Sequence, residues 1–318
     1  MTVRFWGVRG SSPRPIGPEE LRDKLAKILH HVKPEHLQSS ENQRRFLSKL
    51  PAELLGIVGG NTACIELRTN ANAMVVFDTG TGLRDLEQRI KKTSESIDEY
   101  HIFLSHFHYD HLLGLPYFGA MYNPRGRITF YSPFPHMEQS LKKFMVAPYH
   151  PVGWDSFAAD IRFRTLQEDE VLQLGETKIE WIYRNHPNGC SSYKASEAGK
   201  SFIYSTDTEL TEKDFQRTEK HIAYFQNADA IVLDTQYTLG EAIERYNWGH
   251  SSYSLAVEFA REFGIRRLYL FHHDPLNSDA TMEDILKSAR LLDKRLEHRS
   301  GKSPVIIDLA REGHTLEL

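Results

Sequence analysis

Six short apolar segments of this sequence each run into a histidine or an aspartate, and this repetition constrains the fold more than any other feature. The segments are 75–77, 102–104, 181–183, 202–204, 231–233 and 268–271, and the polar residues that follow them are Asp78, His106, His186, Asp207, Asp234 and His272. Continuous apolar runs of this length are typical of buried strands. Open sheets bind ligands at their strand ends. We therefore expect many strands to converge on one polar edge.

The second of these segments leads into the densest group of metal-binding side chains in the sequence. His106, His108, Asp110 and His111 fall within six residues. On an extended backbone the first three would share one side of the chain, and His111 joins them only if the chain turns. Such a turn would let two side chains face one metal ion and two face another. Imidazole with carboxylate suits zinc, manganese or iron. A His-rich surface loop is the alternative, and the polar residues at the other strand ends argue against it.

These residues give the chain a resemblance to the metallo-β-lactamase-fold metallohydrolases, whose signature is the H-x-H-x-D-H pattern at 106–111. The segment 78–82 resembles the first motif of that superfamily, and 4–10 with 59–62 resemble the amino-terminal part of a bacterial subgroup. Two further segments, 249–252 and 271–275, resemble the phosphodiesterase branch, which includes tRNA 3′-processing endonucleases and cyclic-nucleotide phosphodiesterases. The resemblance implies an α+β fold, a four-layer αββα sandwich that forms one domain over residues 1–318.

The resemblance also implies a site with two divalent metal ions, with zinc ahead of manganese and iron. The implied ligands are His106, His108 and His186 for one ion, Asp110, His111 and His272 for the other, and Asp207 as the bridge between them. Asp78 would not be a ligand. It would lie behind the ligands, where a carboxylate fixes the orientation of a metal-bound histidine.

The expected catalytic residues are Asp110, His250 and Asp234. In the implied mechanism a hydroxide that bridges the metal ions attacks phosphorus or a carbonyl carbon. His250 then donates a proton to the departing alkoxide, and Asp234 keeps His250 charged. A helix-start histidine that contacts the backbone is the alternative for His250. Arg9 lies between glycines in a loop and is a candidate for a phosphate contact, with an ordinary surface arginine as the alternative.

Composition limits the partners of the chain. Its 318 residues include 39 Lys and Arg against 43 Asp and Glu, a net charge of −4. This balance argues against long nucleic acid as a partner and leaves a small phosphodiester or nucleotide as the expected substrate. Two cysteines are too few for a disulfide framework. The first ten residues are no signal peptide, and no run approaches about 18 apolar residues, so we expect a cytoplasmic protein without a membrane span.

Residues 14–58 differ in character from the rest of the chain. Pro18 precedes Leu21, Leu25 and Leu29, a spacing that predicts one apolar face of a helix. Related chains have a much shorter link here, so the segment is an insertion. It is a candidate lid or dimer-forming arm, which makes a homodimer possible. A helical hairpin packed on the flank of the sheet is the alternative.

The sequence also predicts the local structure or role of five other segments. Residues 112–122 are predicted to be helical, with breaks at Gly114 and Pro116. The aromatic-rich segment 132–165 would wall a substrate pocket or form a satellite core under a long loop. Residues 239–249 would form a loop that leads to His250. Residues 305–309 and 315–318 would close the chain as a pair of strands.

The sequence is compatible with three hydrolytic functions and disfavours two other classes of protein. A phosphodiesterase for a cyclic nucleotide or another small nucleotide ester comes first. A tRNA 3′-processing endoribonuclease comes second, because the acidic balance and the lack of a Gly/Pro-rich basic arm count against it. A lactonase or thioesterase comes third, because neither needs an acid such as His250. A flavodiiron-type oxidoreductase is disfavoured because position 108 is His rather than Glu. An intact ligand set argues against a non-catalytic metal carrier.

Overall fold

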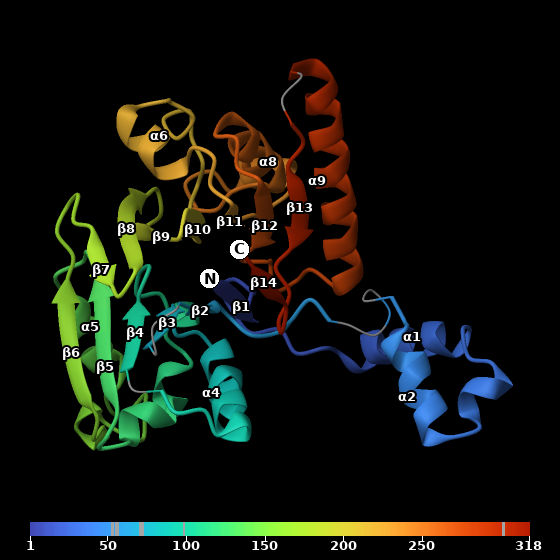
Figure 1. Cartoon of the computed structure of the whole chain (residues 1–318), viewed down its shortest axis with the longest axis horizontal. Helices are drawn as coiled ribbons and strands as arrows, with labels where there is room; N and C mark the ends of the chain where they lie inside the picture. The colour runs from blue at the N-terminus through green and yellow to red at the C-terminus, as the bar shows by residue number, and fades with distance from the viewer. Residues whose placement is uncertain (52–53, 55–56, 70–72, 98, 301–302) are drawn as a thin grey trace.

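Two seven-stranded mixed sheets form the centre of the computed structural model, which describes residues 1–318 except 52–53, 55–56, 70–72, 98 and 301–302 (Figure 1). The first sheet has the order β14-β1-β2-β3-β4-β5-β6. Its strands are β1 (Thr2–Gly7), β2 (Cys64–Arg68), β3 (Ala73–Phe77), β4 (Glu99–Phe103), β5 (Arg127–Ser132), β6 (Asp160–Thr165) and β14 (Thr315–Glu317). From β3 to β6 neighbouring strands run parallel, and the other pairs are antiparallel.

The second sheet has the order β13-β12-β11-β10-β9-β8-β7. Its strands are β7 (Leu172–Leu174), β8 (Thr177–Arg184), β9 (Cys190–Glu197), β10 (Lys200–Ser205), β11 (Ala230–Asp234), β12 (Arg267–Phe271) and β13 (Ile306–Leu309). Strands β10 to β13 run parallel, and the pairs from β7 to β10 are antiparallel. Each sheet therefore has one parallel half and one antiparallel half.

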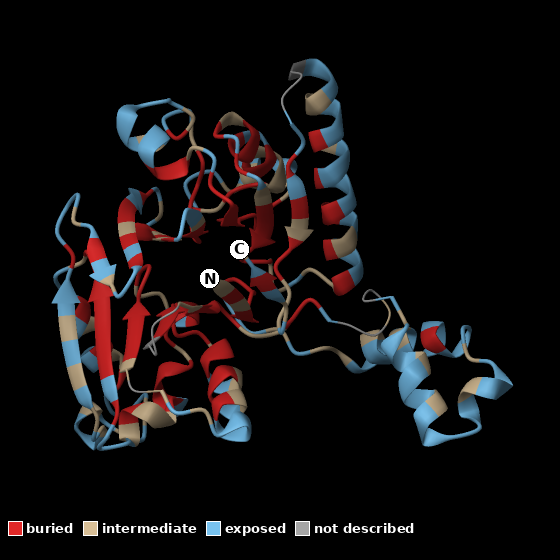
Figure 2. Ribbon diagram, viewed as in Figure 1, coloured by how far each residue is buried: buried red, intermediate tan, exposed pale blue. Residues whose placement is uncertain are grey.

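Aromatic side chains fill the space between the sheets. Phe77 of β3 packs against Phe103 of its own sheet and against three rings of the other sheet, with ring centroids 5.3 to 6.2 Å apart. Those three are Tyr193, Phe202 and Tyr204. The central strands are buried along most of their length (Figure 2). Continuous apolar runs are thus explained by strands with one face toward this core and the other toward helices.

Helices cover the outer face of each sheet and complete the four layers. On the first sheet these are α4 (Gly82–Thr93) and α5 (Met137–Phe144), and on the second α6 (Glu219–Phe225), α8 (Tyr253–Glu262) and α9 (Asp279–Ser300) (Figure 1). Leu83 and Leu86 of α4 belong to the buried cluster that also contains Val76 and Ile102, so the helix buries its apolar stripe. The predicted αββα sandwich is confirmed. Among the described helices, none is long and apolar enough to cross a membrane.

The parallel strands bring their ends to a common level. Phe77, Phe103 and Tyr131 are in register at the ends of β3, β4 and β5. In the second sheet Ser205 pairs with Leu233 and Asp234 pairs with Phe271. Because the predicted polar residues at these strand ends lie at these positions or within three residues after them, both sheets deliver them to one edge.

Residues 14–51 project from the sandwich as a helical arm (Figure 1). The arm contains α1 (Pro18–Leu29), a 3-10 turn η1 (Pro34–Leu37) and α2 (Ser40–Ser48). Its base is tied to the start of α9, where Lys24 Nζ lies 3.0 Å from Asp279 Oδ2. Leu21, Leu25 and Leu29 are 46, 50 and 68% exposed, so the apolar face of α1 does not pack on the sandwich. The role of this arm as a lid or dimer contact stays a prediction.

Three expectations about local structure are corrected. Residues 112–122 form short 3-10 turns, η3 (Leu115–Tyr117) and η4 (Gly119–Tyr122), rather than a helix. The segment 239–249 contains a short helix, α7 (Leu239–Glu244), which starts with a capping box between Thr238 and Glu241. Strands β13 and β14 do not pair with each other. They join different sheets, because each extends a sheet edge that earlier strands have formed.

Truncation of Phe77 to Ala is expected to lower the free energy of unfolding by about 3–5 kcal/mol, because it opens a cavity in the aromatic core between the sheets. Leu25→Ala on the exposed face of α1 serves as the control and should change it by no more than about 0.5 kcal/mol. Denaturant unfolding followed by circular dichroism measures both. Equal effects of the two substitutions would contradict this view of the core.

Candidate metal centre

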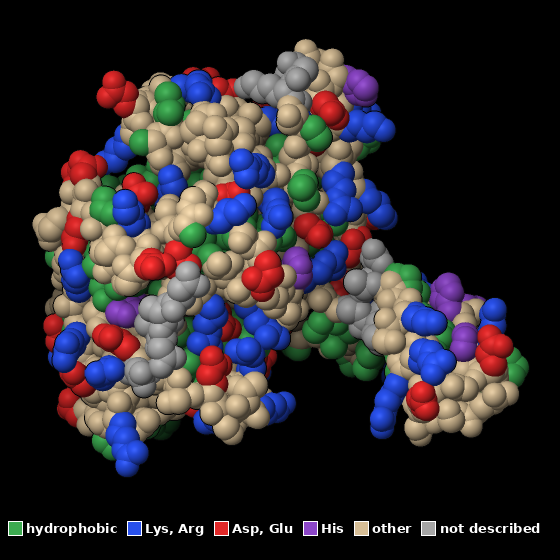
Figure 3. Space-filling view, in the orientation of Figure 1, with side chains coloured by type: hydrophobic (Ala, Val, Ile, Leu, Met, Phe, Trp, Pro, Cys, Tyr) green, Lys and Arg blue, Asp and Glu red, His purple; other side chains and the backbone are tan. Residues whose placement is uncertain are grey.

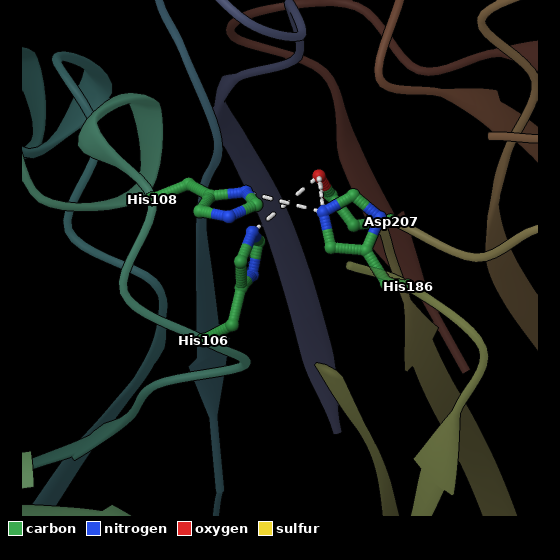
Figure 4. Close-up of side chains that lie close together, drawn as sticks. All are labelled: His106, His108, His186 and Asp207. Atoms are coloured by element: carbon green, nitrogen blue, oxygen red, sulfur yellow. Dashed lines mark hydrogen bonds and ion pairs between the residues drawn. The ribbon is translucent and has the colours of Figure 1, made fainter. Parts of the chain in front are cut away.

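Seven side chains at the common edge form two groups with metal-ligand character. The first group is His106, His108, His186 and Asp207, and the second is Asp110, His111, Asp207 and His272. Within each group the candidate ligand atoms all lie within 4.8 Å of one another. Figure 4 shows the three rings of the first group and the carboxylate of Asp207 pointing toward one another. The structure therefore brings together every residue that the sequence nominated as a ligand.

The carboxylate of Asp207 belongs to both groups. Its Oδ2 lies 3.6 Å from Nε2 of His106 and 3.6 Å from Nε2 of His186. Its Oδ1 lies 3.1 Å from Nε2 of His111 and 3.2 Å from Nε2 of His272. Because each oxygen faces a different group, Asp207 has the placement of a bridging ligand.

The donor atoms fit a pair of divalent cations. Among the described residues, the buried Nε2 atom of His106 has no hydrogen bond, although buried polar atoms nearly always have a partner. Burial lowers the pKa of His106, so its ring is neutral and carries a free lone pair. Burial also opposes a charge on His111, but Asp110, Asp207 and Asp78 outweigh it and raise the pKa of that ring. A bound cation would neutralise the negative charge of these three carboxylates.

Hydrogen bonds to Nδ1 turn three of the rings so that Nε2 faces the centre. Asp78 Oδ2 accepts from His111 Nδ1 at 2.7 Å, Gln236 Oε1 from His272 Nδ1 at 3.1 Å, and the carbonyl of Gly249 from His186 Nδ1 at 2.8 Å. Such partners fix the tautomer and direction of a ligand. The expected position of Asp78 behind the ligands matches this contact. The sequence did not predict that Gln236 and the carbonyl of Gly249 orient candidate ligands. Its only signal for this role was that Gln236 lies close to the end of β11.

The backbone at three strand ends adopts the left-handed conformation. The φ angles are +58° at Asp78, +41° at Asp207 and +57° at His272. Non-glycine residues adopt this conformation uncommonly, and it is concentrated at functional sites. Here it turns the chain sharply after β3, β10 and β12, which directs each side chain to the edge rather than along its strand.

Two glycines allow the backbone to pass directly beside the imidazole rings. A Cβ at Gly10 would lie 2.4 Å from Nδ1 of His272, and a Cβ at Gly249 would lie 2.3 Å from Nδ1 of His186. Any other residue at these positions would displace a candidate ligand. The sequence showed these glycines but gave no indication of what they contact.

His250 and Asp234 form a pair beside the two groups. Nδ1 of His250 lies 2.7 Å from Oδ2 of the fully buried Asp234. Burial alone would lower the pKa of His250, but the charge and hydrogen bond of Asp234 outweigh it and raise the pKa to about 9. A cavity of about 450 Å³ is lined by His250 together with Ser11, Phe107, His108, Tyr109, Asp110 and Asp207. A charged imidazole therefore shares one cavity with candidate ligands of both groups.

The aromatic segment 132–165 lies behind this cavity. Phe134 packs against Phe107, and Phe144 against Tyr109, each with ring centroids 6.0 Å apart. The residues of this segment do not line the cavity themselves. The segment therefore packs behind the residues that line the cavity and does not form the pocket wall itself.

The expectation that Arg9 contacts a phosphate is wrong. Its side chain has no exposed surface. Its guanidinium donates to the carbonyls of Gly59, Asp274 and Asn277 at 2.8 to 3.0 Å and lies 3.5 Å from Asp279 Oδ1. Arg9 therefore joins the first loop to the segment before α9 and is not available to a ligand.

Known proteins resemble this chain in sequence and in overall fold. A family model described as Beta-lactamase superfamily domain matches residues 73–273. Ribonuclease Z of Thermoplasma acidophilum is 26% identical over 263 residues, which cover 68% of this chain and 81% of the relative. The metallo-beta-lactamase fold protein YhfI from Bacillus subtilis superposes with a TM-score of 0.64 at 15% identity, covering 100% of this chain and 98% of YhfI. Zn(2+)-bound PqqB from Methylobacterium extorquens gives 0.63 at 14% identity, with 100% of both chains covered.

Replacement of Arg9 by Met is expected to destabilise the protein by about 3 kcal/mol, because it leaves three buried carbonyls without their donor, whereas Asp279 keeps Lys24 and the N–H of Val58 as partners. Arg14→Met removes a partly exposed ion pair to Glu20 instead and should cost no more than about 1 kcal/mol. Chemical unfolding provides the comparison. An Arg9→Met protein of unchanged stability that binds inorganic phosphate more weakly than wild type would restore the ligand-contact role.

Proposed function

The chain belongs to the beta-lactamase superfamily, and from that premise we propose that it is a metal-dependent phosphodiesterase for a cyclic nucleotide or another small nucleotide ester. It is a hydrolase, and the phosphodiester is our inference for the bond that it cleaves. The observation that carries the proposal is the His250–Asp234 pair in the cavity of the candidate ligands. An alkoxide leaving group needs a proton, whereas a charged acid in this place has no evident use in a thioesterase.

Two divalent cations are the proposed cofactor, with zinc first. His106, His108 and His186 would hold one ion, Asp110, His111 and His272 the other, and Asp207 both. When bound, such a pair would lower the pKa of coordinated water toward about 7 and would offset negative charge on a phosphate. The nitrogen and oxygen donors suit zinc, and the Zn(2+)-bound PqqB with the same fold supports this choice.

The residues of the chain supply the proton and the shape of the site. Because Nδ1 of His250 is bound to Asp234, Nε2 is the atom that donates to the leaving oxygen. The Asp234 carboxylate stabilises the charged ring before that transfer. The cavity of about 450 Å³ is within the usual size of small-molecule sites. Phe107 and Tyr109 give it apolar walls, which suit a ribose or base beside the phosphate.

A ribonuclease is the second candidate, because Ribonuclease Z of Thermoplasma acidophilum is similar over 68% of this chain. The acidic net charge counts against RNA for the chain as a whole. The arm differs, since residues 14–51 contain eight Lys and Arg against five Asp and Glu. Figure 3 shows blue and purple side chains spread over this arm. RNA contact through the arm would therefore meet less repulsion than contact elsewhere.

Loss of His250 is expected to separate proton donation from metal binding. His250→Ala should retain its metal content and lose about 10²–10⁴-fold in kcat on a cyclic nucleotide. The loss should be smaller on bis-p-nitrophenyl phosphate, because p-nitrophenolate leaves without a proton. His298→Ala, at an exposed position of α9, is the control. Metal analysis accompanies both assays. A metal-loaded wild-type protein that cleaves neither ester but opens lactones or thioesters would refute the proposal.

The salt dependence of cleavage and a substitution in the arm distinguish the two candidate substrates. We expect kcat/KM to be higher for the small ester than for RNA with a 3′ extension. Cleavage of the small ester should depend little on salt, whereas contacts to several phosphates make RNA cleavage fall steeply. Arg44→Glu on the exposed surface of α2 should leave the small-ester rate unchanged. A preference for RNA that both salt and Arg44→Glu abolish would favour the ribonuclease.

A further inference from the structure

We propose that Glu209 is a positioning residue whose carboxylate holds the turn 247–249, and through it both His186 and His250, in place. The inference about His250 rests on the proposed function, and the inference about His186 rests only on its role as a ligand. Glu209 lies two residues after Asp207 and is 8% exposed. It does not line the cavity that holds the candidate ligands, so it acts through other groups.

Two backbone N–H groups of the turn converge on this carboxylate. The N–H of Asn247 donates to Oε1 and the N–H of Gly249 donates to Oε2, each at 3.0 Å. Both residues have positive φ angles, +67° at Asn247 and +87° at Gly249. Left-handed turns present their N–H groups on one side and so form a concave site for an anion. Glu209 fills that site from within the protein.

The turn controls the direction of two functional rings. The carbonyl of Gly249 accepts the hydrogen bond from His186 Nδ1 at 2.8 Å, which directs Nε2 of that ring toward the other ligands. His250 follows Gly249 directly in the chain. A movement of Gly249 would therefore rotate a candidate metal ligand and displace the proton donor together.

Residues 208–210 also form hydrogen bonds with Asn185, which precedes His186, and with Ser251, which follows His250. The N–H of Glu209 donates to the carbonyl of Asn185 at 2.8 Å. On its neighbours, the carbonyl of Thr208 accepts from Ser251 Oγ at 2.5 Å and the N–H of Leu210 donates to the same Oγ at 2.9 Å. Residues 208–210 thus fix 185 and 251 through the backbone, and the Glu209 carboxylate fixes the turn between them.

A carboxylate is required because both of its oxygens accept. In Glu209→Gln one acceptor becomes an NH₂ group that faces a backbone N–H, so one hydrogen bond is lost and two donors are opposed. Groups that orient ligands from behind typically change metal affinity or activity by about 10–100-fold when they are replaced. We expect losses of that size in metal retention and in turnover of an ester with a poor leaving group.

The matched control is Asp229→Asn. Asp229 is a buried carboxylate that accepts from the N–H of Ser201 at 3.0 Å and precedes β11, whereas Asp234 ends that strand. It therefore lies at the opposite end of the sheet. The three proteins are loaded with zinc and compared in resistance to a chelator, in the ratio of kcat for a cyclic nucleotide to kcat for bis-p-nitrophenyl phosphate, and in thermal stability.

Glu209→Gln should lose zinc about 10–100-fold more readily than wild type and should have a lower kcat ratio, because a misplaced acid slows the poor leaving group more. Asp229→Asn should lose stability only. If Glu209→Gln does not fold, Glu209→Asp replaces it, since a shorter carboxylate cannot reach both N–H groups. Zinc retention and a kcat ratio equal to wild type would overturn the proposal. If wild type cleaves no phosphodiester, the proposed function fails, and zinc retention alone decides the role of Glu209.

Discussion

The buried carboxylate of Asp78 is the interaction on which the edge of both sheets depends. It accepts hydrogen bonds from the N–H and Oγ of Ser105 at 2.7 Å, from His111 Nδ1 at 2.7 Å and from the hydroxyl of Tyr204 at 2.6 Å. Ser105 follows β4 of the first sheet, and Tyr204 belongs to β10 of the second. A buried carboxylate is tolerated only with such partners. One group therefore ties the sheets together and directs a ring of the candidate metal centre.

The centre follows from this joining of two sheets. Neither sheet alone contains a complete ligand group, because the loop after β4 supplies His106 to His111 while the second sheet supplies His186, Asp207 and His272. The left-handed residues at the strand ends direct their side chains to the edge, and Gly10 and Gly249 leave room for the rings of His272 and His186. The packing of the two sheets on each other therefore forms both the aromatic core between them and the polar edge.

Much of this arrangement could be predicted from the sequence, because apolar runs mark strands and polar residues mark their ends. The convergence of the polar strand ends on one edge belongs to that class, whereas the αββα sandwich and the set of seven candidate ligands were implied by the resemblance to the metallo-β-lactamase-fold metallohydrolases. The partners of Nδ1 could not be predicted, since a carbonyl such as that of Gly249 has no sequence signature. Strand pairing could not be predicted either, because β13 and β14 were expected to pair with each other but join different sheets. Arg9 was misjudged because a loop between glycines suggests exposure, whereas three carbonyls from distant segments enclose its guanidinium.

The division of the ligands between the sheets has a consequence for biosynthesis. The first group is complete only when Asp207 has been made, and the second only when His272 has been made. A nascent chain on the ribosome therefore cannot present both candidate ligand sets until His272 has been translated and the two sheets have docked.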